Sequence, residues 1–286
     1  MALVVESTAS NSVTGSNNLT ITKPTGVEVG DLLIAVLGSY NGAISTLSGW
    51  TLGANRLSSV SYINVQYKIA DSGDVAASNY TFTIANNQIN GGSILRVSGQ
   101  SGLNPVQYTD DDEQLNATGT AISFTTSVTP AADGSLLVMG FSCDDGTGAA
   151  TSINGYSVTG ASTTWTELHD YSADIGGSAS PVTAAAYSVL GTASAITAYG
   201  ATTGIALDDH AGIFMVVNPL IDATASHTLI TTDTDIFTPN GTADTITLEQ
   251  SLVTTDTTTF AQTGRATSPT QWTNETKPST TWTNET

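Results

Sequence analysis

The residues of this chain that could do chemistry are mainly carboxylates, gathered in short clusters. These are Asp110–Glu113 in "YTDDDEQ", Asp144-Asp145, Asp208-Asp209, and Asp233 with Asp235. Carboxylate oxygens are the ligands that Ca²⁺ prefers, but no cluster has the spacing of an EF-hand loop. We therefore favour solvated acidic loops. If one cluster does bind calcium, we expect it at Asp110, Asp111, Asp112 and Glu113, where neighbouring carboxylates would otherwise repel one another.

The histidines and the single cysteine give no pattern typical of an enzyme. His169 and Asp170 are adjacent, as are Asp209 and His210, and adjacent residues on a strand point to opposite faces. A Ser-His-Asp hydrolase would also need a nucleophile elbow, and the chain has no G-x-S-x-G. Aspartates follow Cys143 directly and disfavour its thiolate. Without a Walker motif, a dinucleotide-binding fingerprint or zinc spacing, we expect no enzyme activity and no cofactor.

The chain is strongly acidic, yet few of its residues carry a charge. Its 286 residues include 6 Lys+Arg and 25 Asp+Glu, a net charge of -19, and only 11% are charged. Such a surface repels phosphate backbones and anionic lipid, so we expect neither nucleic acid nor a membrane as partner. Thr, Ser, Gly, Asn and Ala are abundant, a composition typical of strands and tight turns. It predicts an all-β protein of extracellular or virion type.

Targeting signals are not found. The start "MALVVESTAS" lacks a basic segment followed by an apolar core, and no run of about 18 apolar residues is present. One cysteine allows no disulfide within the chain. We expect synthesis in a host cytoplasm without a signal peptide, and arrival outside the cell by another route such as assembly into a virion.

Short apolar or alternating runs between turn residues predict seven strands in the first hundred residues. They are Leu3–Glu6, Leu19–Thr22, Asp31–Leu37, Trp50–Leu52, Tyr62–Ile69, Tyr80–Ile84 and Ser93–Val97. No convincing helical period extends beyond about ten residues. Strands of this length and spacing predict a β-sandwich, of jelly-roll type.

The second hundred residues repeat the first in the same order. "KPTGVEVGDLLI" resembles "TPAADGSLLV", and further anchors follow downstream. The aligned residues are Leu32 with Leu136, Trp50 with Trp165, Tyr67 with Tyr187, and Ile94 with Ile213. This order predicts an internal duplication: two tandem sandwiches, at residues 1–102 and 105–220, each burying its own apolar faces.

The tryptophans of the two copies allow two interpretations. Trp50 and Trp165 each stand at the start of a predicted strand, where we expect core aromatics that close one end of each sandwich. The alternative is that they are exposed platforms for sugars, joined by Tyr40 and Tyr156 from neighbouring loops.

Residues 221–286 form a Thr-rich segment with few large apolar side chains, too few for a core of its own. It ends in two copies of WTNET, Trp272–Thr276 and Trp282–Thr286. We expect an extended arm that becomes ordered by adding strands to neighbouring chains. Its partner-binding residues would be Trp272, Trp282, Ile236, Phe237 and Phe260.

Several of these stretches resemble a known module. "ITKPTGVEVGDLLIAVL", "SGWTL", "VQYKIADSG" and "GGSILRVSG" resemble a β-sandwich module that recurs in structural proteins of tailed bacteriophages and in some bacterial surface proteins. The ending "WTNETKPSTTWTNET" is similar to Trp-Thr-Asn-Glu tails of minor virion proteins. The second copy departs from the pattern at Gly134-Ser135 and Tyr187-Ser188.

The resemblance implies a virion component without catalytic residues, in the head, neck, tail or fibre. We expect a non-enzymatic structural protein that decorates or cements the head or tail, with other virion proteins and further copies of itself as partners. The alternative is a glycan- or receptor-binding adhesin. An enzyme such as a depolymerase ranks last, because no carboxylate pair can be placed from the sequence.

Overall fold

The computed structural model describes residues 3–85, 89–102, 105–115, 119–144, 152–172, 181–204 and 208–220, together with the backbone of short strands within 222–260. Residues 1–222 form one compact unit and residues 223–286 a second. The chain is all-β, as predicted; the only helix among the described residues is α1 (Ser72–Ala76). None of the described helices is long and apolar enough to cross a membrane.

The first half of the compact unit, called repeat 1 here (residues 1–102), contains all seven predicted strands. They are β1 (Val4–Thr14), β2 (Asn18–Thr22), β3 (Leu32–Tyr40), β4 (Thr51–Ser58), β5 (Ser61–Ile69), β6 (Asn79–Thr83) and β7 (Ile89–Ser98). One sheet has the order β1-β7-β3-β5-β4, and β2 pairs with β6 in the other. The first strand thus pairs with the last and the second with the last but one, all antiparallel, which is jelly-roll connectivity.

Repeat 2 (residues 105–220) has the same connectivity. Its strands are β8 (Val106–Gln114), β9 (Ala121–Val128), β10 (Leu136–Asp144), β11 (Ile153–Thr159), β12 (Thr166–Ser172), β13 (Val182–Val189), β14 (Ile196–Thr203) and β15 (Asp209–Val217). The five-stranded sheet runs β8-β15-β10-β13-β12, and the outer sheet β9-β14-β11. β11 has no counterpart among the described strands of repeat 1. The shared strand order supports the predicted duplication.

The register of the ladders also repeats. Thr51 lies opposite Tyr67, and Thr166 opposite Tyr187. A β-bulge interrupts β4 between Leu52 and Ala54, and another interrupts β12 between Glu167 and His169, two residues after the strand start in each case. Because bulges are features of a fold rather than accidents, their recurrence at one position supports a common origin.

One aligned pair needs correction. Leu32 lies opposite Val97, and Leu136 opposite Val217. Counting back along both ladders, the counterpart of Ile94 is Phe214, so the alignment of Ile94 with Ile213 is wrong by one residue. In a strand such a slip places a side chain on the opposite face.

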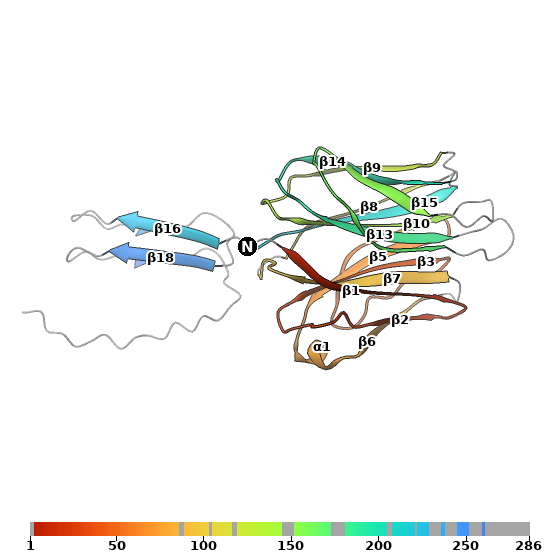
Figure 1. The fold of residues 1–286 in the computed structure, drawn as a ribbon, viewed down its shortest axis with the longest axis horizontal. Coiled ribbons are helices and arrows are strands. Elements are labelled where there is room, and N and C mark those ends of the chain that lie inside the picture. Colours follow the sequence, from red (N-terminus) through yellow and green to blue (C-terminus); the bar gives the residue numbers. More distant parts are fainter. Residues whose placement is uncertain are drawn as a thin grey trace, which may run out of the picture. The chain divides into compact units, whose positions relative to one another are not determined.

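The two five-stranded sheets pack against each other, so the compact unit of residues 1–222 has four layers. Figure 1 shows β2 and β6 at one side, then the β3 sheet, then the β10 sheet, then β9 and β14. The expectation that each copy buries its own apolar faces therefore holds only for the outer layers, and the predicted boundary at residues 102–105 lies inside one compact unit. The inner faces form a shared core made of Leu32, Ile34, Val36, Ile63, Val65, Leu95 and Val97 with Leu136, Val138, Ala185, Ala211, Ile213, Met215 and Val217.

The inner sheets face each other with approximate two-fold symmetry. β3 contacts its counterpart β10 at the centre, β4 contacts β8 at one side, and β1 contacts β12 at the other. β8 is the counterpart of β1, and β12 is the counterpart of β4. The β4–β8 contact and the β1–β12 contact are therefore equivalent, with repeat 1 and repeat 2 exchanged. This is the arrangement of an isologous dimer interface, here within a single chain.

Glycines allow the inner sheets to approach closely. A Cβ added to Gly38 would lie 1.8 Å from Thr183 Oγ1, and one added to Gly140 would lie 2.5 Å from Val36 Cγ1. β3 and β10 are buried on both faces, which explains their continuous apolar runs "LLIAVL" and "LLVMGF".

Four further strands are described between residues 222 and 260, nearly all of them in the second unit. β16 (Asp222–Thr228) pairs with β18 (Thr245–Ser251), and β17 (Ile236–Phe237) pairs in parallel with β19 (Thr259–Phe260).

Candidate functional site

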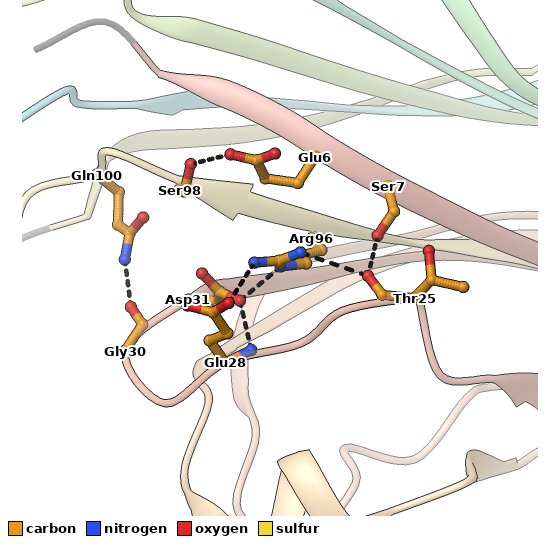
Figure 2. A network of polar contacts seen from close by, with 9 residues as sticks. All are labelled: Glu6, Ser7, Thr25, Glu28, Gly30, Asp31, Arg96, Ser98 and Gln100. Carbon is orange, nitrogen blue, oxygen red and sulfur yellow. Dashed lines mark hydrogen bonds and ion pairs between the residues drawn. The ribbon is translucent and has the colours of Figure 1, made fainter.

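A polar network centred on Arg96 of β7 holds the turn between β2 and β3 (Figure 2). Arg96 Nε donates to Asp31 Oδ2 at 2.6 Å, and the backbone N–H of Glu28 donates to the same oxygen at 2.7 Å. The Arg96 and Asp31 side chains are only 15% and 8% exposed. Ser7 of β1 donates to the carbonyl of Thr25 at 2.8 Å, and Arg96 Nη1 reaches that carbonyl at 3.5 Å. The network thus ties the turn to both β1 and β7.

The turn itself is shaped by two glycines with left-handed backbone conformations, Gly26 at φ +72° and Gly30 at φ +98°. Only glycine adopts such angles without steric cost. Between them, Val29 is 68% exposed and the Glu28 side chain 80%. Val29 is therefore exposed on a turn that the Arg96 network holds in place.

The same network reaches the point where the C-terminal segment leaves the compact unit. Gln100 donates through Nε2 to the carbonyl of Gly30 and forms a β-bridge with Pro219. Leu220 N donates to Gly99 O at 2.6 Å, and Ser101 N to Asn218 O at 3.0 Å. We call residues 99–102 and 218–220 the arm junction.

Repeat 2 holds its equivalent turn without an ion pair between the positions of Arg96 and Asp31. Ser135 and Val216 occupy the places of Asp31 and Arg96. Ser135 Oγ donates to Ala132 O at 2.7 Å, and Gln107 Nε2 donates to Thr129 O at 2.8 Å. The ion pair between Arg96 and Asp31 therefore has no counterpart in repeat 2.

The proposed calcium ligands lie on β8, an edge strand, rather than in a loop. Asp111 and Glu113 face β4, where Arg56 bonds to them at 3.4 and 2.9 Å. Asp110 faces the other way and accepts from Tyr108 Oη at 3.3 Å. Because alternate side chains of a strand point to opposite faces, the four carboxylates do not converge. Among the described residues no group of three or more His, Cys, Asp or Glu is placed to hold a metal ion.

Arg56 supplies a positive charge that repeat 2 does not have, since no Lys or Arg occurs between Arg96 and Arg265. The ion pairs therefore join the two repeats. Burial raises the pKa of Asp111, and the Arg56 charge opposes that rise. Acidic side chains on an exposed edge also discourage pairing with a foreign strand.

Trp50 lies in the core, as favoured from the sequence. It is 7% exposed and packs edge-on against Tyr80 and Phe82 at ring-centroid distances of 5.3 and 5.8 Å. It offers no free face to a sugar.

The other aromatic residues considered for sugar binding are half-buried. Trp165 packs against Tyr156 of β11, with ring centroids 6.3 Å apart, at the margin of the repeat 2 core. Burial raises the Tyr156 pKa, and Glu167 and Asp170 raise it further. Tyr40 ends β3 and is half-buried, and burial and Asp144 raise its pKa. Tyr40 and the Trp165–Tyr156 pair belong to different repeats.

Two of the histidines, His169 and His210, are packed into the interior. His169 lies between the inner sheets, with Nδ1 2.8 Å from Ser93 Oγ and Nε2 3.5 Å from Thr183 Oγ1. Burial lowers its pKa to about 3. His210 is fully buried beside Phe124, and burial lowers its pKa to about 4. Ser93 and Thr183 are themselves buried, so this polar cluster joins the repeats and has no open face for a substrate.

Sequence reasoning missed Arg96, Asp31 and Gln100. The scarcity of cations is the signal that could have found Arg96 and its acidic partner, because Arg56, Lys68 and Arg96 all form ion pairs with carboxylates. No such signal marks Gln100. Of the residues expected to bind partners, Ile236, Phe237 and Phe260 lie on strands whose backbone alone is described, and Trp272 and Trp282 lie outside the described residues.

Comparison with known proteins gives no relative: no family model, no curated protein and no solved structure matches this chain.

Proposed function

We propose that this chain is a non-enzymatic structural protein of a tailed-bacteriophage particle, made in the host cytoplasm, which decorates or cements the head or tail. The observation that carries the proposal is the arm junction. Two fused sandwich repeats share one core, and the segment that follows them begins at a strand-like bridge pinned through Gln100 to the turn at Gly30. A rigid body with a firmly rooted C-terminal segment suits a protein that fastens subunits together.

The internal chemistry supports a structural role. His169 and the carboxylates of β8 join the repeats to each other, and Trp50 fills a core. The residues best suited by type to catalysis or sugar stacking are thus used for packing. The partners would be other virion proteins and further copies of the chain, contacted by backbone pairing.

Deletion of residues 223–286 tests this proposal. The compact unit ends at Asp222, so the shortened chain should keep its β-sheet circular dichroism while its incorporation into particles falls below detection. Particles assembled with full-length or shortened chain would be purified and their content of the protein measured by quantitative mass spectrometry. A folded, shortened chain that is incorporated at the normal level would refute the proposal.

A further inference from the structure

We propose that the outer edge of β6 receives an extended strand from a neighbouring subunit, which completes the outer sheet of repeat 1. In the part of the chain that the structure describes, that sheet has two strands, β2 and β6, whereas the equivalent sheet of repeat 2 has three, β9, β14 and β11. The third strand, β11, lies beside β14, the counterpart of β6. Repeat 1 thus has the neighbours of this strand but not the strand itself.

The two repeats begin this pairing in the same way. In repeat 1 a β-bridge joins Ile44 to Ile84, and in repeat 2 the first pair of β11 joins Ile153 to Thr203. β11 then continues along β14, with Ser157 opposite Gly200 and Thr159 opposite Ala198. In repeat 1 the chain turns away instead.

Gln66 of β5 holds the segment that leaves the sheet after Ile44. Its side chain donates to Ser45 O at 3.0 Å and accepts from Leu47 N at 2.8 Å. Trp50 N then donates to Leu47 O at 2.9 Å, and β4 follows. Beyond the bridge at Ile44, no described strand pairs with the outer edge of β6.

The backbone groups of Thr81 point to this edge. Thr83 O accepts from Ser45 N at 2.9 Å, so it points away from β2. Residues two apart on a strand point their N–H and C=O groups to the same side, which places those of Thr81 outward too. The Thr81 and Thr20 hydroxyls lie 2.9 Å apart, as expected for a closely spaced pair that exchanges no backbone bonds.

The chemistry of the occupant can be inferred from β11, whose sequence "INGYSVT" is uncharged and has its half-buried residues at alternate positions after Gly155. β6, "NYTFT", is uncharged as well, whereas β8, another edge strand, carries four consecutive acids. An uncharged, alternating strand would therefore avoid the repulsion that the acidic surface imposes elsewhere, and main-chain hydrogen bonds would hold it. Only the assignment of this strand to a neighbouring subunit rests on the proposed function.

A synthetic peptide of residues 152–160, SINGYSVTG, serves as the probe for the edge in the full-length chain. At about 1 mM peptide, which suits the weak binding of one short strand, we expect slower amide hydrogen exchange at Thr81, measured by mass spectrometry. In the peptide, the amide of Ser157 should point towards β6 and hydrogen-bond to it. N-methylation at Ser157 should therefore weaken binding at least tenfold. N-methylation at Val158, whose amide points away, should not.

In the protein, Thr81→Pro removes the outward N–H and leaves the β2 ladder bonds in place, since proline is tolerated at such edge positions; Thr81→Ala is the matched control. We expect Thr81→Pro to abolish protection and Thr81→Ala to retain it. No protection of the wild-type edge, or equal binding of the two methylated peptides, would overturn the inference even if Thr81→Pro fails to fold. Deletion of residues 223–286 tests the proposed function separately, so either proposal can fail alone.

Discussion

The ion pair between Arg96 and Asp31 is a place where one side-chain change should lower the stability of the fold substantially. Changing Arg96→Val leaves the Asp31 carboxylate, 8% exposed, with only a backbone N–H as partner. Breaking a buried pair in this way costs about 3 kcal/mol. We expect the free energy of unfolding, measured by urea titration, to fall by about that amount.

Repeat 2 supplies the matched control, because Val216 and Ser135 stand at the equivalent positions. The double variant Arg96→Val with Asp31→Ser copies that neutral arrangement and should recover most of the lost stability. If the double variant is as unstable as Arg96→Val alone, the carboxylate is not the source of the cost.

His169 gives the unfolding free energy a pH dependence. Its ordinary pKa of 6.5 is lowered to about 3 by burial, so between these values the unfolded chain binds a proton that the folded chain does not. This contribution to stability is full above pH 6.5 and is lost as the pH falls towards 3, roughly 2 kcal/mol between pH 7 and pH 5.

Urea titrations of wild type and His169→Gln at pH 7 and pH 5 isolate this term. Burial raises the pKa of the neighbouring Asp170 to about 6, which acts in the opposite direction but is present in both proteins. The wild type should lose about 2 kcal/mol more than His169→Gln does over this range. Equal losses would contradict a neutral, buried His169.

The role of a side chain could be predicted where its residue type alone indicates that role. It could not be predicted where the role depends on which residues meet in the folded chain. Trp50 was expected in the core because a large aromatic beside a strand start needs burial. The carboxylates of "YTDDDEQ" suggested a ligand cluster, but on a strand they diverge and two of them meet Arg56. Their partner is distant in sequence, so no local pattern could reveal it.

The close approach of the inner sheets depends on the glycines of β3 and β10. Gly38→Ala would place a methyl group 1.8 Å from Thr183 Oγ1, inside a core that cannot yield without strain. We expect a loss of about 1–3 kcal/mol in the free energy of unfolding, measured by urea titration. Gly191→Ala is the control, because a Cβ there meets nothing within 4 Å, and it should be neutral. A neutral Gly38→Ala would mean that the sheets are farther apart than the structure places them.

The strands of repeat 1 could be predicted because apolar runs are separated there by clear turn residues, and all seven are present. β1 extends to Thr14, well past the predicted end at Glu6. The prediction ended too early because the polar residues of β1 follow no simple alternation, and only pairing with β7 defines the strand. β11 was missed because "INGYSVTG" reads as a loop, and its pairing partner β14 lies some forty residues downstream.

At the scale of the whole molecule, the sequence indicated two copies but not that they share a core. β3 and β10 are apolar on both faces, and a continuous apolar run does not say which neighbour covers each face. The Arg56 bridges, the His169 contacts and the shared apolar cluster all cross between the repeats. Separate unfolding would expose that entire face of both repeats to water.

We therefore expect the two repeats to unfold in one cooperative transition. Replacing Trp272 and Trp282 by Phe, and then either Trp50 or Trp165 by Phe, leaves one fluorescent reporter in repeat 2 or in repeat 1. Coincident urea midpoints for the two reporters would indicate a single unit. Adding Arg96→Val, which lies in repeat 1, should shift both midpoints equally, because the shared core couples them. If Trp165 keeps its midpoint while that of Trp50 falls, the repeats are independent domains and the shared core contributes little to their stability.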